Sequence, residues 1–224
     1  MPDLVELYPL IFETRLVRTP QQLVAAQEVR YRAYCEERRL MDAAQFPEQR
    51  ENDVDDARSV HVLLVLLPTG SVVGTVRLVL PAREASARLL LPVERVAAPG
   101  CFESVPGFDR ESSAEVSRLC LTREAAPSRK SDDTELRYVQ RHAMVGLVRG
   151  LVSLSREHGV EGWCAMTAPV TRRRLTWLGI HFASVGEPIE HYGPKQPLFS
   201  PFEALLETVR KERPDVWELI TLPL

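Results

Sequence analysis

The fold is decided by Glu51-Asn-Asp-Val-Asp-Asp56 and, two residues later, Ser59-Val-His-Val-Leu-Leu-Val-Leu-Leu67. The first stretch holds four acids in six residues, and the second is apolar on both faces of an extended chain. Strands that are apolar on both faces are typical of the interior of a sheet. The sequence therefore predicts a loop of carboxylates that leads directly into a buried strand.

A second strand is expected at Ser71–Leu80, because Pro68-Thr-Gly70 can form the turn of a β-hairpin with the first. Alternation along this strand places Arg77 on a half-apolar face with Val73, Thr75 and Val79. Burying an unpaired guanidinium is costly. Arg77 should therefore meet an acid or an anionic ligand.

A further strand, Ser113–Leu121, contains Glu115 and Arg118. Their spacing of three sends them to opposite faces of a regular strand. A β-bulge between them would bring both to the same side, and bulges recur beside active sites. The spacing therefore predicts a bulged strand at a functional site.

Arg30 lies in the apolar face of a helix expected from Pro20 to about Arg38, which Thr19 and Gln22 can cap. The candidate site combines this arginine with two others and three carboxylates: Arg30, Arg77, Arg118, Asp53, Asp56 and Glu115. Such a set can position an anionic or carbonyl-bearing ligand and supply a general base for an amine. The alternative is an ion-pair network that only holds the acidic loop on the sheet.

The other expected elements complete one α/β domain over residues 1–224 with a mixed sheet. They are a strand at Leu10–Val17, a helix from Thr134 to about His158, a strand at Gly162–Ala168, a helix at Pro169–Leu178, a strand or pair at Phe182–Tyr192 and a helix at Phe202–Arg210. Within the long helix Gly146 and Gly150 lie one turn apart, which indicates either tolerance or close packing.

Composition restricts the function. The formal charge of −3 gives no general attraction to nucleic acid. The four cysteines lack C-x-x-C spacing, so no metal site is expected and the thiols should be reduced. No signal peptide and no segment of about 20 apolar residues occurs, which predicts a cytoplasmic protein without a transmembrane segment. His61 and Cys120 are interpreted as core residues, a hydrogen-bonded histidine and an inert thiol.

Several blocks resemble known acyltransferases. Glu51-x-Asp53-x-x-Asp56, Gly74-Thr-Val-Arg77-Leu and Glu115-Val-Ser-Arg118-Leu are similar to the signature blocks of acyl-homoserine lactone synthases and N-acyl amino acid synthases. Closer still is the acyltransferase family associated with PEP-CTERM/exosortase systems, which the chain resembles in Ser59-Val-His61, Val73–Pro81 and Gly186–Gly193.

The resemblance implies a GNAT-like three-layer α/β domain in which a thioester lies between two splayed strands. By this likeness Glu115, Arg77 and Arg118 are the candidate catalytic residues, with Glu115 the base. Arg30, Asp53 and Asp56 would bind substrate, and the length of the acyl pocket should depend on side chains that include Met166 and Trp177. The expected acceptor is a small amine such as an amino acid.

No bound cofactor is expected, and the co-substrate is an acyl-phosphopantetheine thioester. In place of the glycine-rich loop that holds the coenzyme A pyrophosphate in ordinary GNAT enzymes, residues 125–133 have no glycine and end in Asp132-Asp133. Acyl carrier protein is therefore the expected donor and partner, with coenzyme A as the alternative. Arg129, Lys130, Arg172, Arg173 and Arg174 would dock this acidic protein. Two other functions remain open, a non-catalytic acyl-binding module and a plain acetyltransferase.

Overall fold

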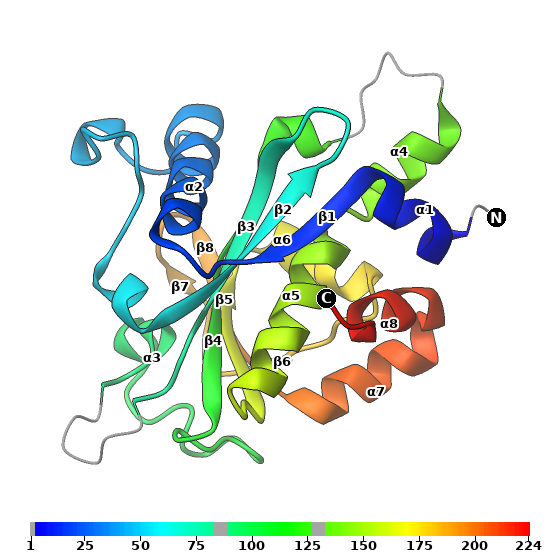
Figure 1. Ribbon diagram of the computed structural model, residues 1–224. Coiled ribbons are helices and arrows are strands. Elements are labelled where there is room, and N and C mark those ends of the chain that lie inside the picture. The colour runs from blue at the N-terminus through cyan, green and yellow to red at the C-terminus, as the bar shows by residue number, and fades with distance from the viewer. Residues whose placement is uncertain (1–2, 83–88, 127–132) are drawn as a thin grey trace.

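A mixed β-sheet forms the centre of the structure, a computed structural model that describes residues 3–82, 89–126 and 133–224. Figure 1 shows the strands in the middle of the molecule with helices packed around them. The strand order is β1-β2-β3-β4-β5-β8-β6, and β7 pairs with β8. The bounds are β1 (Phe12–Leu16), β2 (Ser59–Leu66), β3 (Ser71–Val79), β4 (Ser113–Leu121), β5 (Gly162–Thr167), β6 (Ala183–Ser184), β7 (Ile189–Glu190) and β8 (Pro194–Pro201).

Helices cover both faces of this sheet. Val72 of β3 packs with Val29 of α2, whereas its neighbour Val73 belongs to the core beneath α5. Successive side chains of a strand point to opposite faces, so α2 and α5 lie on opposite sides. The helices are α1 (Leu4–Ile11), α2 (Pro20–Tyr31), α3 (Pro92–Val96), α4 (Thr134–Arg141), α5 (Met144–Glu157), α6 (Pro169–Trp177), α7 (Phe202–Glu212) and α8 (Pro214–Thr221), with 3-10 turns at Ala43–Gln45, Val54–Arg58 and Arg123–Ala125.

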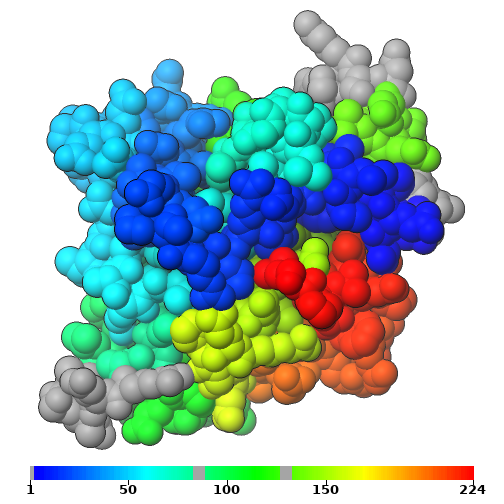
Figure 2. Space-filling model, in the orientation of Figure 1, coloured from blue at the N-terminus to red at the C-terminus, as the bar shows by residue number. Residues whose placement is uncertain are grey.

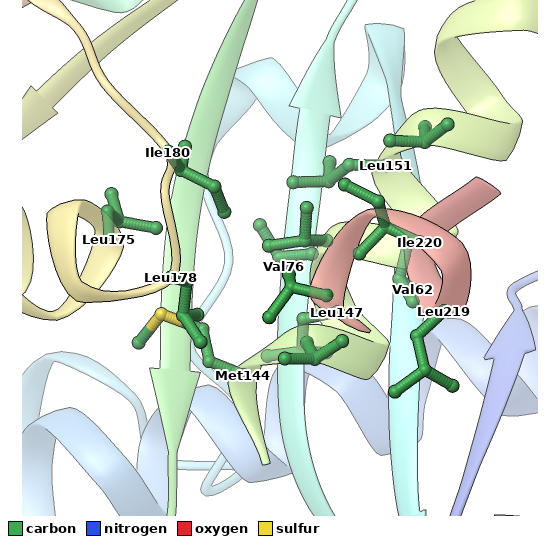
Figure 3. Close-up of a cluster of buried hydrophobic side chains, with 14 of the residues drawn as sticks. Val62, Val76, Met144, Leu147, Leu151, Leu175, Leu178, Ile180, Leu219 and Ile220 are labelled. Carbon is green, nitrogen blue, oxygen red and sulfur yellow. The ribbon is translucent and has the colours of Figure 1, made fainter. Parts of the chain in front are cut away.

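The main core lies on the α5 side of the sheet. Figure 3 shows Val62 and Val76 from the sheet facing Leu147 and Leu151 of α5, with Ile220 of α8 beside them. In Figure 2 the C-terminal residues, in red, lie between the N-terminal segment in blue and α5 in yellow-green. This core joins both ends of the chain to the centre of the sheet.

The sheet opens between its two parallel strands. β4 and β5 pair only from Ser113 to Val116 with Gly162 to Ala165, and the remainder of each strand lies outside this ladder. The two strands therefore form a V that is closed at the Ser113 end and open at the Leu121 end. This gap is the splayed sheet that the sequence resemblance implied.

Gly150 lets α5 approach β2 closely. A Cβ atom at this position would overlap Val62 Cγ1. We expect Gly150→Ala to lower the free energy of unfolding by about 1–3 kcal/mol through overpacking, although alanine is the better helix former. Urea denaturation measures the loss. Adding Val62→Ala should recover part of it, and strictly additive losses would contradict the contact.

Two helix boundaries differ from expectation. Residues Leu10 and Ile11 belong to α1, because Asp3 caps that helix, so the strand begins only at Phe12. The expected long helix from Thr134 is capped by Asp133 and breaks at His142. The Tyr8 hydroxyl occupies the break, donating to the Ala143 carbonyl and accepting from the Gly146 amide, both at 2.8 Å. The contact comes from a distant segment, so no local pattern signalled it.

Strand β8 and the helices α1, α3 and α8 were not expected from the sequence. Strand β8 contains Pro194 and Pro197, residues that argue against a central strand. The prolines are tolerated because β8 pairs along β5 on one side but only with the two-residue strands β6 and β7 on the other. The expected strand at Phe182–Tyr192 is reduced to these two short pieces. After Tyr31, helix α2 also widens into a π-helix over Arg32–Glu37 instead of continuing as an α-helix.

Candidate active site

A closed ring of alternating charges lies on the α2 side of the sheet. Arg30 pairs with Glu51 at 2.6 Å and with Asp56 at 2.7 Å. Arg77 bridges Asp56 at 2.7 Å and Asp53 at 2.5 Å. Arg118 joins Asp53 at 2.8 Å to Glu51 at 3.0 Å, which completes the ring. Each carboxylate therefore contacts two arginines and each arginine two carboxylates.

Most of this charge ring is buried. Arg30 and Arg77 are almost inaccessible, whereas about a quarter of the Asp53 and Arg118 side chains is exposed. Burial alone would raise the pKa of Asp56, but Arg30 and Arg77 hold it well below its usual value. The ring matches three arginines with three carboxylates, with Asp53 and Arg118 at its accessible edge.

Arg118 reaches the ring because β4 bulges at this residue. Arg77 faces Ser117 and Thr75 faces Cys120, so one residue of β3 opposes two of β4. The bulge gives Arg118 a φ of 55°, a left-handed conformation that is uncommon for residues other than glycine. The bulge predicted from the spacing of Glu115 and Arg118 is therefore present.

Glu115 stands apart from the ring. Its side chain is 3% exposed and accepts a hydrogen bond of 2.6 Å from the Val93 amide at the start of α3. Desolvation by burial raises the pKa of Glu115 to about 7, although the Val93 amide and Arg77 oppose the shift. A carboxyl with this pKa exchanges its proton readily near neutral pH, which suits acid–base chemistry.

A cavity of about 580 Å³ passes through the gap between β4 and β5. This volume lies within the range of about 300–1,000 Å³ that is usual for ligand sites. On the α2 side its lining is polar and includes Asp53, Arg77, Glu115 and Arg118. On the α5 side it is apolar, with Met144, Val148, Leu151, Trp163, Leu175, Ile180 and Phe182. A ligand with a polar head and an apolar tail fits this arrangement.

Comparison with known proteins agrees with this geometry. Residues 29–132 match the model of the acetyltransferase (GNAT) domain. TofI, solved in a ternary complex with an inhibitor and MTA, superposes with a TM-score of 0.61 at 20% identity, covering 88% of this chain and 96% of TofI. The chain has the GNAT fold. No curated protein sequence matches it.

Two more solved structures share this GNAT fold. MesI, a CoA-dependent acyl-homoserine lactone synthase, gives a TM-score of 0.57 at 21% identity over 89% of this chain and 94% of its own. FeeM, an N-acyl amino acid synthase from uncultured soil microbes, gives 0.56 at 15% identity over 88% and 93%. The fold expected from the sequence blocks is thus confirmed.

The structure brings only some of the predicted site residues to the cavity of this GNAT fold. Asp53, Arg77, Glu115, Arg118, Met166 and Arg174 line it. Arg30 and Asp56, predicted to bind substrate, lie behind the wall as buried members of the charge ring. The ion-pair network considered as the alternative is therefore present, but its edge also forms part of the cavity.

Three predicted residues lie elsewhere. Trp177 stacks on His142 at 4.6 Å and under the Arg213 guanidinium at 5.1 Å, in a separate depression on the surface. Arg172 bonds Ser184, and Arg173 is exposed on α6. Arg129 and Lys130 lie outside the described residues. Trp177 is not a pocket residue because its indole, at the end of α6, packs on His142 and Arg213.

Sequence reasoning missed Glu51, Tyr34 and Lys195. Glu51 takes the place in the ring that Glu115 was expected to fill, although it stood in the acidic stretch. Tyr34 lines the cavity from the π-helix, a rare structure that often marks functional sites. Lys195 carried no signal because its strand, β8, was not recognised.

Cys120 and His61, which the sequence analysis interpreted as core residues, are both buried, but His61 lacks the expected hydrogen bond. Burial raises the pKa of the Cys120 thiol to about 11, which makes it a poor nucleophile. Burial lowers the pKa of His61 to about 4, so the ring is neutral, but neither nitrogen has a hydrogen-bond partner in the described structure. Within residues 3–82, 89–126 and 133–224, no metal-binding cluster and no helix able to cross a membrane was found.

Proposed function

We propose that this protein transfers a medium or long acyl group from a phosphopantetheine thioester to the amine of a small acceptor such as an amino acid. The observation that carries the proposal is the cavity that joins Glu115 to an apolar compartment through the gap in the sheet. A non-catalytic acyl-binding module would have no use for a buried, unpaired carboxyl beside the gap.

In the proposed reaction the thioester carbonyl lies in the V between β4 and β5, with its acyl chain toward α5. Glu115 accepts a proton from the acceptor amine, directly or through water, and the amine nitrogen attacks the carbonyl carbon. Backbone N–H groups of the bulged part of β4 hold the oxyanion. When the intermediate collapses, the C–S bond breaks and the thiolate takes up the proton that Glu115 accepted, so the product leaves as the thiol.

The charge ring has a positioning role in this proposal. Arg77 and Arg118 were predicted as catalytic residues, but both already donate to carboxylates of the ring. Arg30, Asp56 and Arg77 therefore fix the wall of the acceptor site. Among the members of the ring, Asp53 and Arg118 have the most exposed side chains and are the best placed to meet a substrate.

We further propose acyl carrier protein as the donor, with coenzyme A as the alternative. Asp133 caps α4 with its carboxylate, which disfavours a pyrophosphate at this helix terminus. Arg174, exposed on α6 at the cavity, and its neighbours Arg172 and Arg173 suit an acidic partner, as would Arg129 and Lys130. MesI, which shares the fold, is described as CoA-dependent, so the donor needs a direct test. The kinship with PEP-CTERM/exosortase-associated acyltransferases rests on the sequence blocks alone.

A donor series tests the proposed function. The protein is incubated with acyl carrier protein or coenzyme A thioesters of increasing acyl length and a pool of amino acids, and N-acyl products are identified by mass. We expect products from medium and long acyl donors and little from acetyl donors, because the inner cavity is apolar. Donor binding without turnover would support the binding module, and transfer from acetyl-coenzyme A alone would support a plain acetyltransferase.

A further inference from the structure

Lys195 presents a cation to the polar side of the cavity. It lies on β8, opposite Ile189 of β7, in the hairpin that turns through Tyr192 and Gly193. Its side chain is half-buried, lines the cavity, and holds its ammonium nitrogen 5.8 Å from the Tyr192 ring centroid. The hairpin thus brings this lysine to the same cavity as Glu115.

The charge of Lys195 is not matched within the part of the chain that the structure describes. No carboxylate of the described residues forms an ion pair with it, whereas Arg77 and Arg118 are matched within the charge ring. Burial and the positive charge of Arg118 lower the pKa of the Lys195 ammonium, and Glu115 opposes them. A half-buried ammonium beside a guanidinium is unfavourable unless an anion joins it.

The whole lining has the same imbalance. Six basic side chains, Arg38, Arg77, Arg95, Arg118, Arg174 and Lys195, face the cavity with only Asp53, Asp55 and Glu115 as acids. Arg77 and Arg118 are matched within the charge ring and Arg95 pairs with Asp55, so Arg38, Arg174 and Lys195 remain opposite Glu115, which is half neutral near pH 7. The cavity is therefore built for a substrate that carries negative charge.

We infer that Lys195 binds an anionic group, a carboxylate, on the amine acceptor and so makes the enzyme selective for amino acids over uncharged amines. The inference rests on the proposed function. The acceptor amine must reach Glu115, and Lys195 lines the same cavity as Glu115 and Arg118. A carboxylate next to the amine can therefore meet Lys195 while the amine meets Glu115.

Kinetics with matched acceptors test the role of Lys195. Amino acids are compared with the corresponding amino acid amides, which keep the side chain and lose the negative charge. Wild type should prefer the acid by about tenfold or more in kcat/KM. Lys195→Met should remove this preference by raising KM for the acid alone, and Lys195→Arg should retain much of it. Lys211→Met, at a lysine exposed on α7, is the control and should behave as wild type.

Two other results of these kinetics would overturn the inference. An unchanged preference in Lys195→Met overturns the inference, as does a raised KM for the donor alone, which would place the donor phosphate at Lys195. A second experiment measures binding without turnover. N-acyl amino acids and N-acyl amino acid amides are compared in their ability to displace a fluorescent fatty acid from the protein at equilibrium. If no amine is acylated, the proposed function fails. The inference is still supported if the protein binds the N-acyl amino acid more tightly than its amide and this preference depends on Lys195. Equal binding of both products overturns it.

Discussion

Replacing Glu115 by glutamine should lower kcat of acyl transfer by about 10²–10⁴-fold, the usual contribution of a general base. Glutamine keeps the size of the side chain and an oxygen that can accept the Val93 amide hydrogen bond. Acceptor and donor binding should therefore change little. Initial rates at saturating substrates measure the loss. Persistence of kcat near the wild-type value in a folded variant would show that Glu115 is not the base.

The pH dependence offers an independent check on the same residue. The active form of a base is the carboxylate, and the pKa of Glu115 is raised to about 7 by burial. The wild-type rate should therefore fall as pH decreases through about 7, whereas the residual rate of Glu115→Gln should lack this step. Glu111→Gln, at an exposed position just before β4, is the matched control and should keep the wild-type profile.

Glu115→Gln should also stabilise the protein at alkaline pH. The pKa of Glu115 is higher in the folded than in the unfolded chain, so the folded state binds more protons between the two values. Stability is thus fully present below the unfolded pKa and falls as pH rises toward about 7. Because glutamine has no charge to bury, the variant should gain about 2–3 kcal/mol over wild type at pH 8. Equal stability at pH 8 would indicate that the carboxylate is solvated.

Replacing Arg30 by methionine should lower the free energy of unfolding at pH 7 by about 3–5 kcal/mol. The change opens the charge ring and leaves Glu51 and Asp56 with one arginine each in a buried place. Urea denaturation measures the effect. Arg15→Met, which removes an exposed pair with Glu13, is the control and should cost less than about 1 kcal/mol.

The effect of Arg30→Met should shrink in acid. The folded pKa of Asp56 lies below its usual value, so its contribution is present above the unfolded pKa and lost as pH falls through the folded one. Protonation of the stranded carboxylates relieves the variant, because a neutral carboxyl is cheaper to bury. Wild type should therefore lose more stability than the variant below about pH 4. A constant difference across pH would contradict an electrostatic origin.

Much of the central sheet could be predicted because its signals are local. The apolar run before the turn at Pro68–Gly70 predicted the hairpin, and the spacing of Glu115 and Arg118 predicted the bulge. The same spacing could not show that the bulge sends Arg118 to the charge ring while Glu115 stays with Val93. That separation depends on which carboxylate of the acidic stretch reaches the guanidinium.

The missed parts of the site depend on distant contacts. The strand β8, which carries Lys195, was not recognised because it contains prolines. It tolerates them because its outer neighbours, β6 and β7, are short. Tyr8 determines where α4 ends and α5 begins, although it lies in another helix. Trp177 is likewise drawn away from the cavity by His142 and Arg213, which come from other parts of the chain. These features follow from tertiary structure and have no local pattern.

Stability and acceptor selectivity depend on different parts of the site. The charge ring takes its members from α2, the acidic stretch, β3 and β4, so it cross-links four segments on one side of the cavity. The hairpin of β7 and β8 also borders the cavity and carries Lys195, and its outer strand β7 contributes only Ile189 and Glu190 to the pairing. Variants selected for new acceptors should therefore accumulate on the hairpin, where a substitution alters recognition without releasing buried charge.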